Sequence, residues 1–159
     1  MKYDFTLSKI EYEEIEQEKQ HYEDSRSASI KALKIIQKKR GWVEDDAIYI
    51  IADLLGISSS DIEGVATFYS QIYRKPVGRH IIRYCDSVVC YINGYQNVEA
   101  KIIELLKIVP GKTTEDGRFT LLPTCCLGNC HKGPTMMIDE DTHNYLKPSD
   151  IQSVLEQYL

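Results

Sequence analysis

The spacing of apolar residues changes abruptly at Lys75-Pro76-Val77-Gly78, and this change constrains the fold more than any other feature of the sequence. Before it, apolar residues recur every three or four positions, as they do on one face of a helix. After it, strand-like runs alternate with helical spacing. Because proline and glycine interrupt regular structure, we place a domain boundary here. The chain is expected to form a helical bundle over residues 1–76 and a sheet-containing domain over residues 77–159.

The first domain is expected to contain four short helices joined by short loops, as in a helical bundle. They span approximately residues 8–22, 27–39, 45–55 and 58–69. Ser8 and Glu11 match the capping box, in which each side chain binds an amide at the start of a helix. Gly41 and Gly56 suit the left-handed residue that ends a helix. The expected apolar faces carry Ile10, Ile15, Ile30, Leu33, Ile36, Ile48, Ile51, Leu54, Leu55, Ile62, Val65, Phe68 and Tyr69.

The second domain is predicted to run strand, helix, strand, hairpin, helix. The expected strands and hairpin occupy about residues 79–84, 118–124 and 135–146, and the expected helices about residues 88–109 and 148–158. Pro123 indicates a bulge or an edge position in the second strand, because it cannot donate a ladder hydrogen bond. A strand-helix-strand crossover implies a parallel pair, and a hairpin adds antiparallel strands. The fold class is therefore α+β or α/β, with a mixed sheet after the helical bundle.

Charge and hydropathy exclude several classes of protein. The net charge of −5 argues against nucleic-acid binding, which requires a basic face. Two of the short helices resemble a helix-turn-helix, but the same acidic balance disfavours that reading. No apolar run approaches the ~20 residues of a membrane helix, and the acidic start of the sequence lacks the pattern of a secretion signal. We therefore expect a cytoplasmic protein, in which five cysteines are metal ligands or redox groups rather than disulfides.

The cysteines form two groups, Cys85 with Cys90, and Cys125 and Cys126 with Cys130. Each group directly follows a predicted strand, and strand ends bring their loops together at one edge of a sheet. Four thiolates can hold a zinc ion or an iron–sulfur cluster. The spacings of four and three intervening residues favour a [2Fe–2S] cluster, because two irons spread their thiolates more widely than one zinc ion does. Zinc remains an alternative from spacing alone.

The residues around the cysteines are compatible with an anionic cofactor. Cys90 lies near the start of a predicted helix, where the helix dipole favours a thiolate. Gly128 allows the backbone to approach closely. Cys125 and Cys130 have the same spacing as Cys85 and Cys90, so spacing does not decide whether Cys125 or Cys126 is a ligand. A single cysteine is often only a small buried apolar residue, but two groups at matching strand ends make that reading poor for all five.

Four motifs together resemble a known family. They are GVATFY at residues 64–69, CDSVVC at residues 85–90, CLGNC at residues 126–130 and GPTMMI at residues 133–138. With them, nearly the whole chain resembles the thioredoxin-like [2Fe–2S] subunits of respiratory complex I, the E subunits of bacterial NADH–quinone oxidoreductases. The resemblance implies a thioredoxin-like domain after the helical bundle. It also implies that Cys85, Cys90, Cys126 and Cys130 hold one [2Fe–2S] cluster through iron, with Cys125 outside the family pattern.

The resemblance further implies an electron-transfer subunit with no catalytic residue of its own. It would exchange single electrons with the flavin of an adjacent subunit that binds FMN and NADH. The complex would pass electrons through iron–sulfur centres to quinone, coupled to proton translocation. The expected partners are this flavin subunit and the other peripheral-arm subunits on the cytoplasmic side of the membrane, with no insertion of this chain into the membrane.

Three alternatives remain at this stage. Related subunits occur in NAD-linked formate dehydrogenases and hydrogenases. A structural zinc module in an assembly protein would use the same thiolates without redox activity. A thioredoxin-type thiol oxidoreductase is the weakest alternative, because the sequence contains no Cys-x-x-Cys motif.

Overall fold

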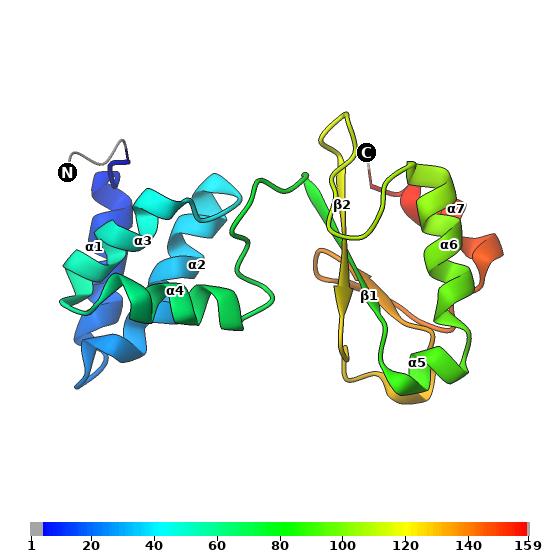
Figure 1. Cartoon of the computed structure of the whole chain (residues 1–159), viewed down its shortest axis with the longest axis horizontal. Coiled ribbons are helices and arrows are strands. Elements are labelled where there is room, and N and C mark those ends of the chain that lie inside the picture. The colour runs from blue at the N-terminus through cyan, green and yellow to red at the C-terminus, as the bar shows by residue number, and fades with distance from the viewer. Residues whose placement is uncertain (1–4, 159) are drawn as a thin grey trace. The chain divides into compact units, whose positions relative to one another are not determined.

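The computed structural model describes residues 5–158. The chain divides into two compact units, Met1–Pro76 (unit 1) and Val77–Leu159 (unit 2). Figure 1 shows that the described part of unit 1 is helical, whereas unit 2 combines a sheet with helices.

Unit 1 contains the four expected α-helices and one short 3-10 helix. They are α1 Lys9–Gln20, the 3-10 helix Ser25–Ala28, α2 Ser29–Arg40, α3 Asp45–Leu55 and α4 Ser59–Phe68. The capping box predicted for α1 is present, since the Ser8 amide donates to Glu11 Oε2 at 2.7 Å and the Glu11 amide donates to Ser8 Oγ at 3.3 Å. Gly41 and Gly56 follow α2 and α3 with φ of 84° and 68°, as predicted.

The core of unit 1 confirms most of the expected apolar faces but contradicts three residues. Ile10 and Phe68 are 60% and 79% exposed, and Tyr69, directly after α4, is 42% exposed. In α1 the buried face is set by Glu11 and Ile15, and Ile10 lies one position away from it. In α4, Phe68 follows the buried Ala66 by two positions, roughly 200° around the helix axis. Ile10 and Phe68 both lie at helix ends. The apolar spacing of the sequence extends to these positions, but their side chains do not face the core.

The buried face of α1 carries a charge that is paired within unit 1. The Glu11 side chain is 2% exposed and accepts two hydrogen bonds from the Arg40 guanidinium, both at 2.9 Å. These bonds lower the pKa of Glu11 to about 2. The pair joins the first turn of α1 to the last residue of α2, and therefore holds these two neighbouring helices together.

Unit 2 is built on a mixed four-stranded sheet, as predicted. Its strands are β1 His80–Cys85, β2 Phe119–Thr124, β3 Met136–Ile138 and β4 Asp141–His143, in the order β2-β1-β3-β4. β1 and β2 are parallel, whereas β3 is antiparallel to both β1 and β4. Pro123 is on the edge strand β2, where its missing amide breaks no ladder.

The helices of unit 2 differ from the prediction in one respect. The single helix expected over residues 88–109 is wrong, because it is divided into α5 Val88–Ile92 and α6 Tyr95–Leu106. Gly94 separates them with φ of 83°, a conformation that does not continue a right-handed helix. α6 ends before Lys107, which has φ of 56°, so the helix stops short of Pro110. The last helix, α7 Ile151–Leu155, follows a 3-10 turn that begins at Pro148.

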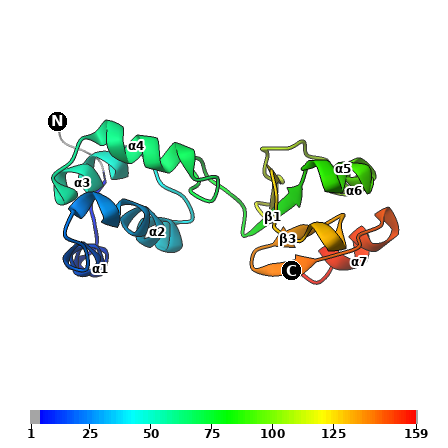
Figure 2. The same cartoon turned by 90° about the horizontal axis from the view of Figure 1, so that it is seen from below.

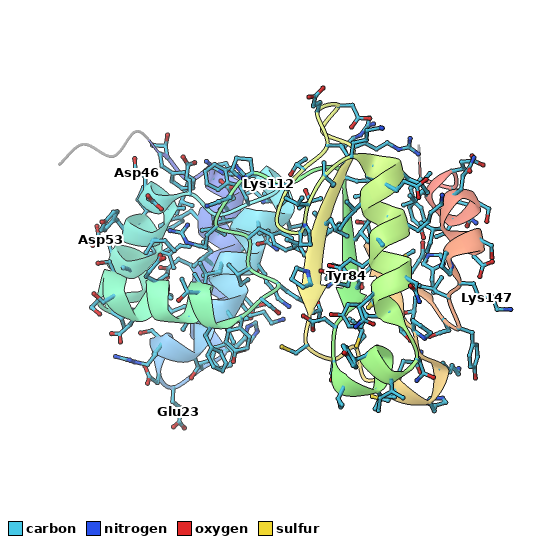
Figure 3. All side chains as sticks on the ribbon, turned by 45° about the vertical axis from the view of Figure 1, so that its right-hand side comes forward. Glu23, Asp46, Asp53, Tyr84, Lys112 and Lys147 are labelled. Carbon is cyan, nitrogen blue, oxygen red and sulfur yellow. The ribbon has the colours of Figure 1, made fainter. Side chains whose placement is uncertain are left out.

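One face of the sheet carries the core of unit 2. Figures 1 and 2 show α6 and α7 together on one side of the strands. Ile82, Leu121 and Met136 face these helices and are fully buried. In Figure 3, Tyr84 lies between β1 and α6, and its hydroxyl donates to Glu99 at 2.5 Å. Since side chains alternate along a strand, Ile81, Arg83 and Cys85 belong to the opposite face.

Candidate metal centre

Three segments of unit 2 meet at the end of β1 that carries the cysteines. β1 ends at Cys85 and β2 at Thr124, directly before the second cysteine group. The Asp86 amide donates to the Thr124 carbonyl at 3.1 Å, and the Cys85 amide donates to the Thr135 carbonyl at 3.1 Å. The chain after β1, the chain after β2 and the chain before β3 are therefore held side by side, beside α5 (Figure 1).

This convergence brings together the two predicted cysteine pairs. The sulfurs of Cys126 and Cys130 are 3.5 Å apart. The Cys85 thiol interacts with those of both Cys90 and Cys126, which links the first pair to the second. Within residues 5–158, no three His, Cys, Asp or Glu side chains are arranged as the ligands of a single metal ion. The thiols instead form two linked pairs.

Cys125 differs from its neighbour Cys126. Its side chain is exposed, and its carbonyl accepts a contact from the Cys85 thiol at 3.7 Å. It is the sulfur of Cys126 that lies beside Cys130. Gly128, with φ of 77°, turns the chain back so that its amide donates to the Cys126 sulfur at 3.3 Å.

The thiols have unequal electrostatic surroundings. Burial, together with the neighbouring Cys85 thiol, raises the pKa of Cys90 to about 11, although the Thr135 backbone opposes this rise. The Gly128 amide lowers the pKa of Cys126, and the adjacent Cys126 in turn raises the pKa of Cys130. The loop after β2 thus favours negative charge on the Cys126 sulfur, whereas Cys85 and Cys90 on the α5 side of the site are buried.

The donor set fits a [2Fe–2S] cluster. Two linked thiol pairs supply the four thiolates that two irons require. Cys85 and Cys90 are 3% and 2% exposed, which shields one side of the site from water. A Cβ atom on Gly133 would lie 3.2 Å from the Cys90 sulfur, so the absence of a side chain at Gly133 leaves that sulfur room.

The roles of two residues of unit 2 were not predicted from the sequence, although one of them, Gly133, belongs to the GPTMMI motif. Gly133 lies in a Gly-Pro turn, and nothing local distinguishes it from an ordinary loop glycine. Arg83 lies between apolar residues in a predicted strand. A charged residue in such a run is unusual, because charged side chains are seldom buried. Only the structure shows that Arg83 is buried, at 7% exposure.

A mixed sheet with helices on one face, and two pairs of thiols at the strand ends, defines an α+β domain of the thioredoxin-like class that is suited to an iron–sulfur cofactor. Residues 15–159 match the family described as "Thioredoxin-like [2Fe-2S] ferredoxin", and the chain belongs to this family. Its cofactor is therefore a [2Fe–2S] cluster.

Individual relatives agree with the family. The E subunit of the NADH-quinone oxidoreductase of Salmonella typhimurium (strain LT2) is 70% identical over 154 residues, which cover 97% of this chain and 93% of the relative. The corresponding protein of Escherichia coli (strain K12) is 69% identical with the same coverage. The resemblance inferred from the four motifs is thus confirmed.

The fold is also similar to part of a larger solved protein. An NAD+-reducing [NiFe]-hydrogenase in the H2-reduced state superposes with a TM-score of 0.66 at 22% identity, covering 79% of this chain and 22% of that chain. At this identity the likeness concerns the fold alone.

In the described residues, 5–158, none of the helices has both the length and the apolar character that a bilayer crossing needs.

Proposed function

We propose that this chain is the [2Fe–2S] electron-transfer subunit of an NADH–quinone oxidoreductase. One joint observation carries the proposal. The chain is 70% identical to such a subunit across 97% of its length, and its two cysteine pairs converge at one end of the sheet. In the whole complex, electrons would pass from NADH through flavin and iron–sulfur centres to quinone, coupled to proton translocation.

The proposed iron ligands are Cys85, Cys90, Cys126 and Cys130. The 3.5 Å distance between the Cys126 and Cys130 sulfurs and the interaction of Cys85 with Cys90 and Cys126 support this set. Cys125 is proposed to be no ligand, since the sulfur beside Cys130 belongs to Cys126.

The residues of this chain would set the conditions for electron transfer. When bound, the [2Fe–2S] cluster supplies a one-electron site, which complements a flavin that receives two electrons with a hydride. The Gly128 amide donates to the Cys126 sulfur, and buried Cys85 and Cys90 keep water from one side. Hydrogen bonds to sulfur and solvent exposure both tune the reduction potential of such sites.

We propose that electrons enter and leave through the exposed side of the site. Cys126 is exposed, so a partner can approach its sulfur closely. We propose that this partner is the subunit that binds FMN and NADH, and that the other peripheral-arm subunits complete the assembly on the cytoplasmic side of the membrane. This chain would contribute no catalytic residue.

The first test is the visible absorption spectrum of the anaerobically purified full chain before and after dithionite, with iron and sulfide assayed on the same sample. We expect broad bands that bleach on reduction, with two irons and two sulfides per chain. A colourless protein with one zinc ion, which also fails to take up iron and sulfide in vitro, would overturn the proposal in favour of a structural zinc module.

A serine series then tests the ligands. Replacing Cys85, Cys90, Cys126 or Cys130 by serine should remove the cluster or change its spectrum, whereas Cys125→Ser is the matched control and should keep it. Loss of the cluster in the Cys125→Ser protein alone would show that Cys125 is the ligand in place of Cys126.

A further inference from the structure

Arg83 is a buried cation in the middle of β1. The residue is 7% exposed, and in the register it lies between Leu122 of β2 and Met137 of β3, which are both apolar. Nη2 donates to the backbone carbonyl of Asp139. Nε is buried and has no hydrogen-bond partner. The side chain is thus held at one end while part of its polar group is left unsatisfied.

No carboxylate of the described residues forms an ion pair with Arg83. The carboxylate of Asp139, whose carbonyl Arg83 binds, is instead engaged by His80 Nδ1 at 2.7 Å and by the Ile81 amide at 2.8 Å. Among residues 5–158, no Asp or Glu oxygen lies within the 4.0 Å of an ion pair with Arg83. By contrast, Arg26, Arg40 and Arg74 each pair with at least one acidic side chain. A buried unpaired charge is strongly unfavourable, so its presence in a native strand calls for a compensating anion.

Within unit 2, the cysteine site would supply the negative charge that compensates Arg83. Cys85 follows Arg83 by two positions, and alternation places both on the same face of β1. Because the guanidinium is held toward Asp139, away from Cys85, we estimate its distance from the thiols as roughly 10 Å, from ~3.3 Å per strand residue. Buried charges interact at such a distance with little screening by salt.

We propose that Arg83 is the fixed countercharge of the [2Fe–2S] site, a positioning residue that acts through its electric field. The inference rests on the proposed function. A [2Fe–2S] cluster on four thiolates is a net anion, and it gains one more negative charge on reduction. A nearby buried cation therefore favours the reduced state and raises the reduction potential. Because arginine stays protonated at all physiological pH values, this contribution would not vary with pH.

The test compares variants of the full chain loaded with iron and sulfide under anaerobic conditions. Arg83→Met removes the charge and should shift the reduction potential to a more negative value. Arg83→Lys keeps the charge and should stay near the wild type at neutral pH. Arg79→Met is the matched control, because Arg79 precedes the same strand but is exposed, and it should leave the potential unchanged.

The thermal stability of the cluster-free proteins gives a second readout. If Arg83 had a purely structural role, replacing it would lower the midpoint temperature of thermal unfolding. A countercharge behaves differently, because without the cluster its charge is unbalanced. We therefore expect cluster-free Arg83→Met to unfold at or above the wild-type temperature, while the loaded variant releases its cluster faster than the loaded wild type.

The outcomes separate this inference from the proposed function. A wild-type chain that holds no [2Fe–2S] cluster overturns both. A wild type with its cluster, but with equal potentials in Arg83→Met and Arg79→Met, overturns the countercharge alone. If Arg83→Met does not fold, the pH profile of Arg83→Lys decides. A buried lysine loses its proton at high pH. The reduction potential of the Arg83→Lys protein should therefore fall below that of the wild type at high pH. A profile parallel to the wild type contradicts the inference.

Discussion

Among the described residues, each unit buries one strongly charged side chain, and the two units treat that charge in opposite ways. In unit 1, Glu11 is neutralised by Arg40 within the same unit. In unit 2, Arg83 forms no ion pair, and its Nε has no hydrogen-bond partner among the described residues. Under the countercharge proposal, the polar interior of unit 1 is complete in the polypeptide alone, whereas that of unit 2 would be complete only with the anionic cluster.

This comparison predicts that the two units respond differently to equivalent changes. Substitutions in unit 1 should alter stability alone. Substitutions in unit 2 should alter stability and cluster retention together, because the strands that form its core also position the cysteines.

The largest effects are expected from a matched pair of core substitutions. Leu33→Ala in α2 and Leu121→Ala in β2 each truncate a leucine with 0% exposure, and each should cost about 3 kcal/mol of unfolding free energy. Denaturant titrations of both variants would be followed by far-UV circular dichroism, which reports the loss of secondary structure, and by visible absorption, which reports the loss of the cluster. We expect only Leu121→Ala to release the cluster early. Early release in Leu33→Ala would show that the units do not unfold independently.

Next is the charge pair of unit 1. The pKa of Glu11 is lowered from 4.5 to about 2 in the folded chain. Its contribution is therefore fully present above the unfolded value and is lost as pH falls toward the folded value. Glu11→Gln should cost about 2 kcal/mol at neutral pH, allowing for the partly exposed Arg40. Unfolding measured from pH 7 to pH 2 should show the wild type and the variant converging below about pH 5. A gap that stays constant would refute the assignment.

A smaller effect is expected at Gly133. An added methyl group would lie 3.2 Å from the Cys90 sulfur, and a ligated sulfur has little freedom to move. Gly133→Ala should cost the loaded protein about 1 kcal/mol and speed the loss of visible absorption in the presence of a chelator. The cluster-free protein should change less, because its Cys90 side chain can shift. Equal losses in both forms would rule out an effect through the ligated sulfur.

The smallest expected effect is an increase in stability when the same glycine-to-alanine change is made in unit 1, at Gly64. Gly64 lies within α4, is exposed, and has no atom within 4 Å of an added Cβ. Gly64→Ala should stabilise the isolated chain by about 0.5 kcal/mol, because alanine favours the helix. Thermal unfolding measures the change. A loss of stability would indicate that α4 packs more tightly around Gly64 than its surroundings imply.

The parts of the fold that local chemistry decides were predicted from the sequence. Ser8 with Glu11 begins α1, and Gly41 and Gly56 end their helices, because these residues act on the backbone next to them. The division between α5 and α6 was not predicted. The apolar spacing continues from Ile92 to Tyr95, and this periodicity outweighed the turn signal of Asn93-Gly94.

The site was predicted in outline for a similar reason. Cysteines after two strands of one sheet must lie near each other, so their convergence follows from topology. The absence of an ion-pair partner for Arg83 did not follow, because it depends on which side chains from other segments approach the strand. Spacing alone also left Cys125 and Cys126 equivalent. The left-handed turn at Gly128 is what directs the Cys126 sulfur toward Cys130.

The parallel pairing of β1 and β2 has a consequence for biogenesis. Parallel strands are joined by a long crossover segment, so their pairing is a long-range contact, and such pairings are among the slow steps of folding. The two cysteine pairs are therefore separated in the nascent chain and meet only when unit 2 is nearly complete. We expect the cluster to be inserted into an already folded domain. Refolding experiments in which iron and sulfide are added before or after the sheet forms would reveal the order of these events.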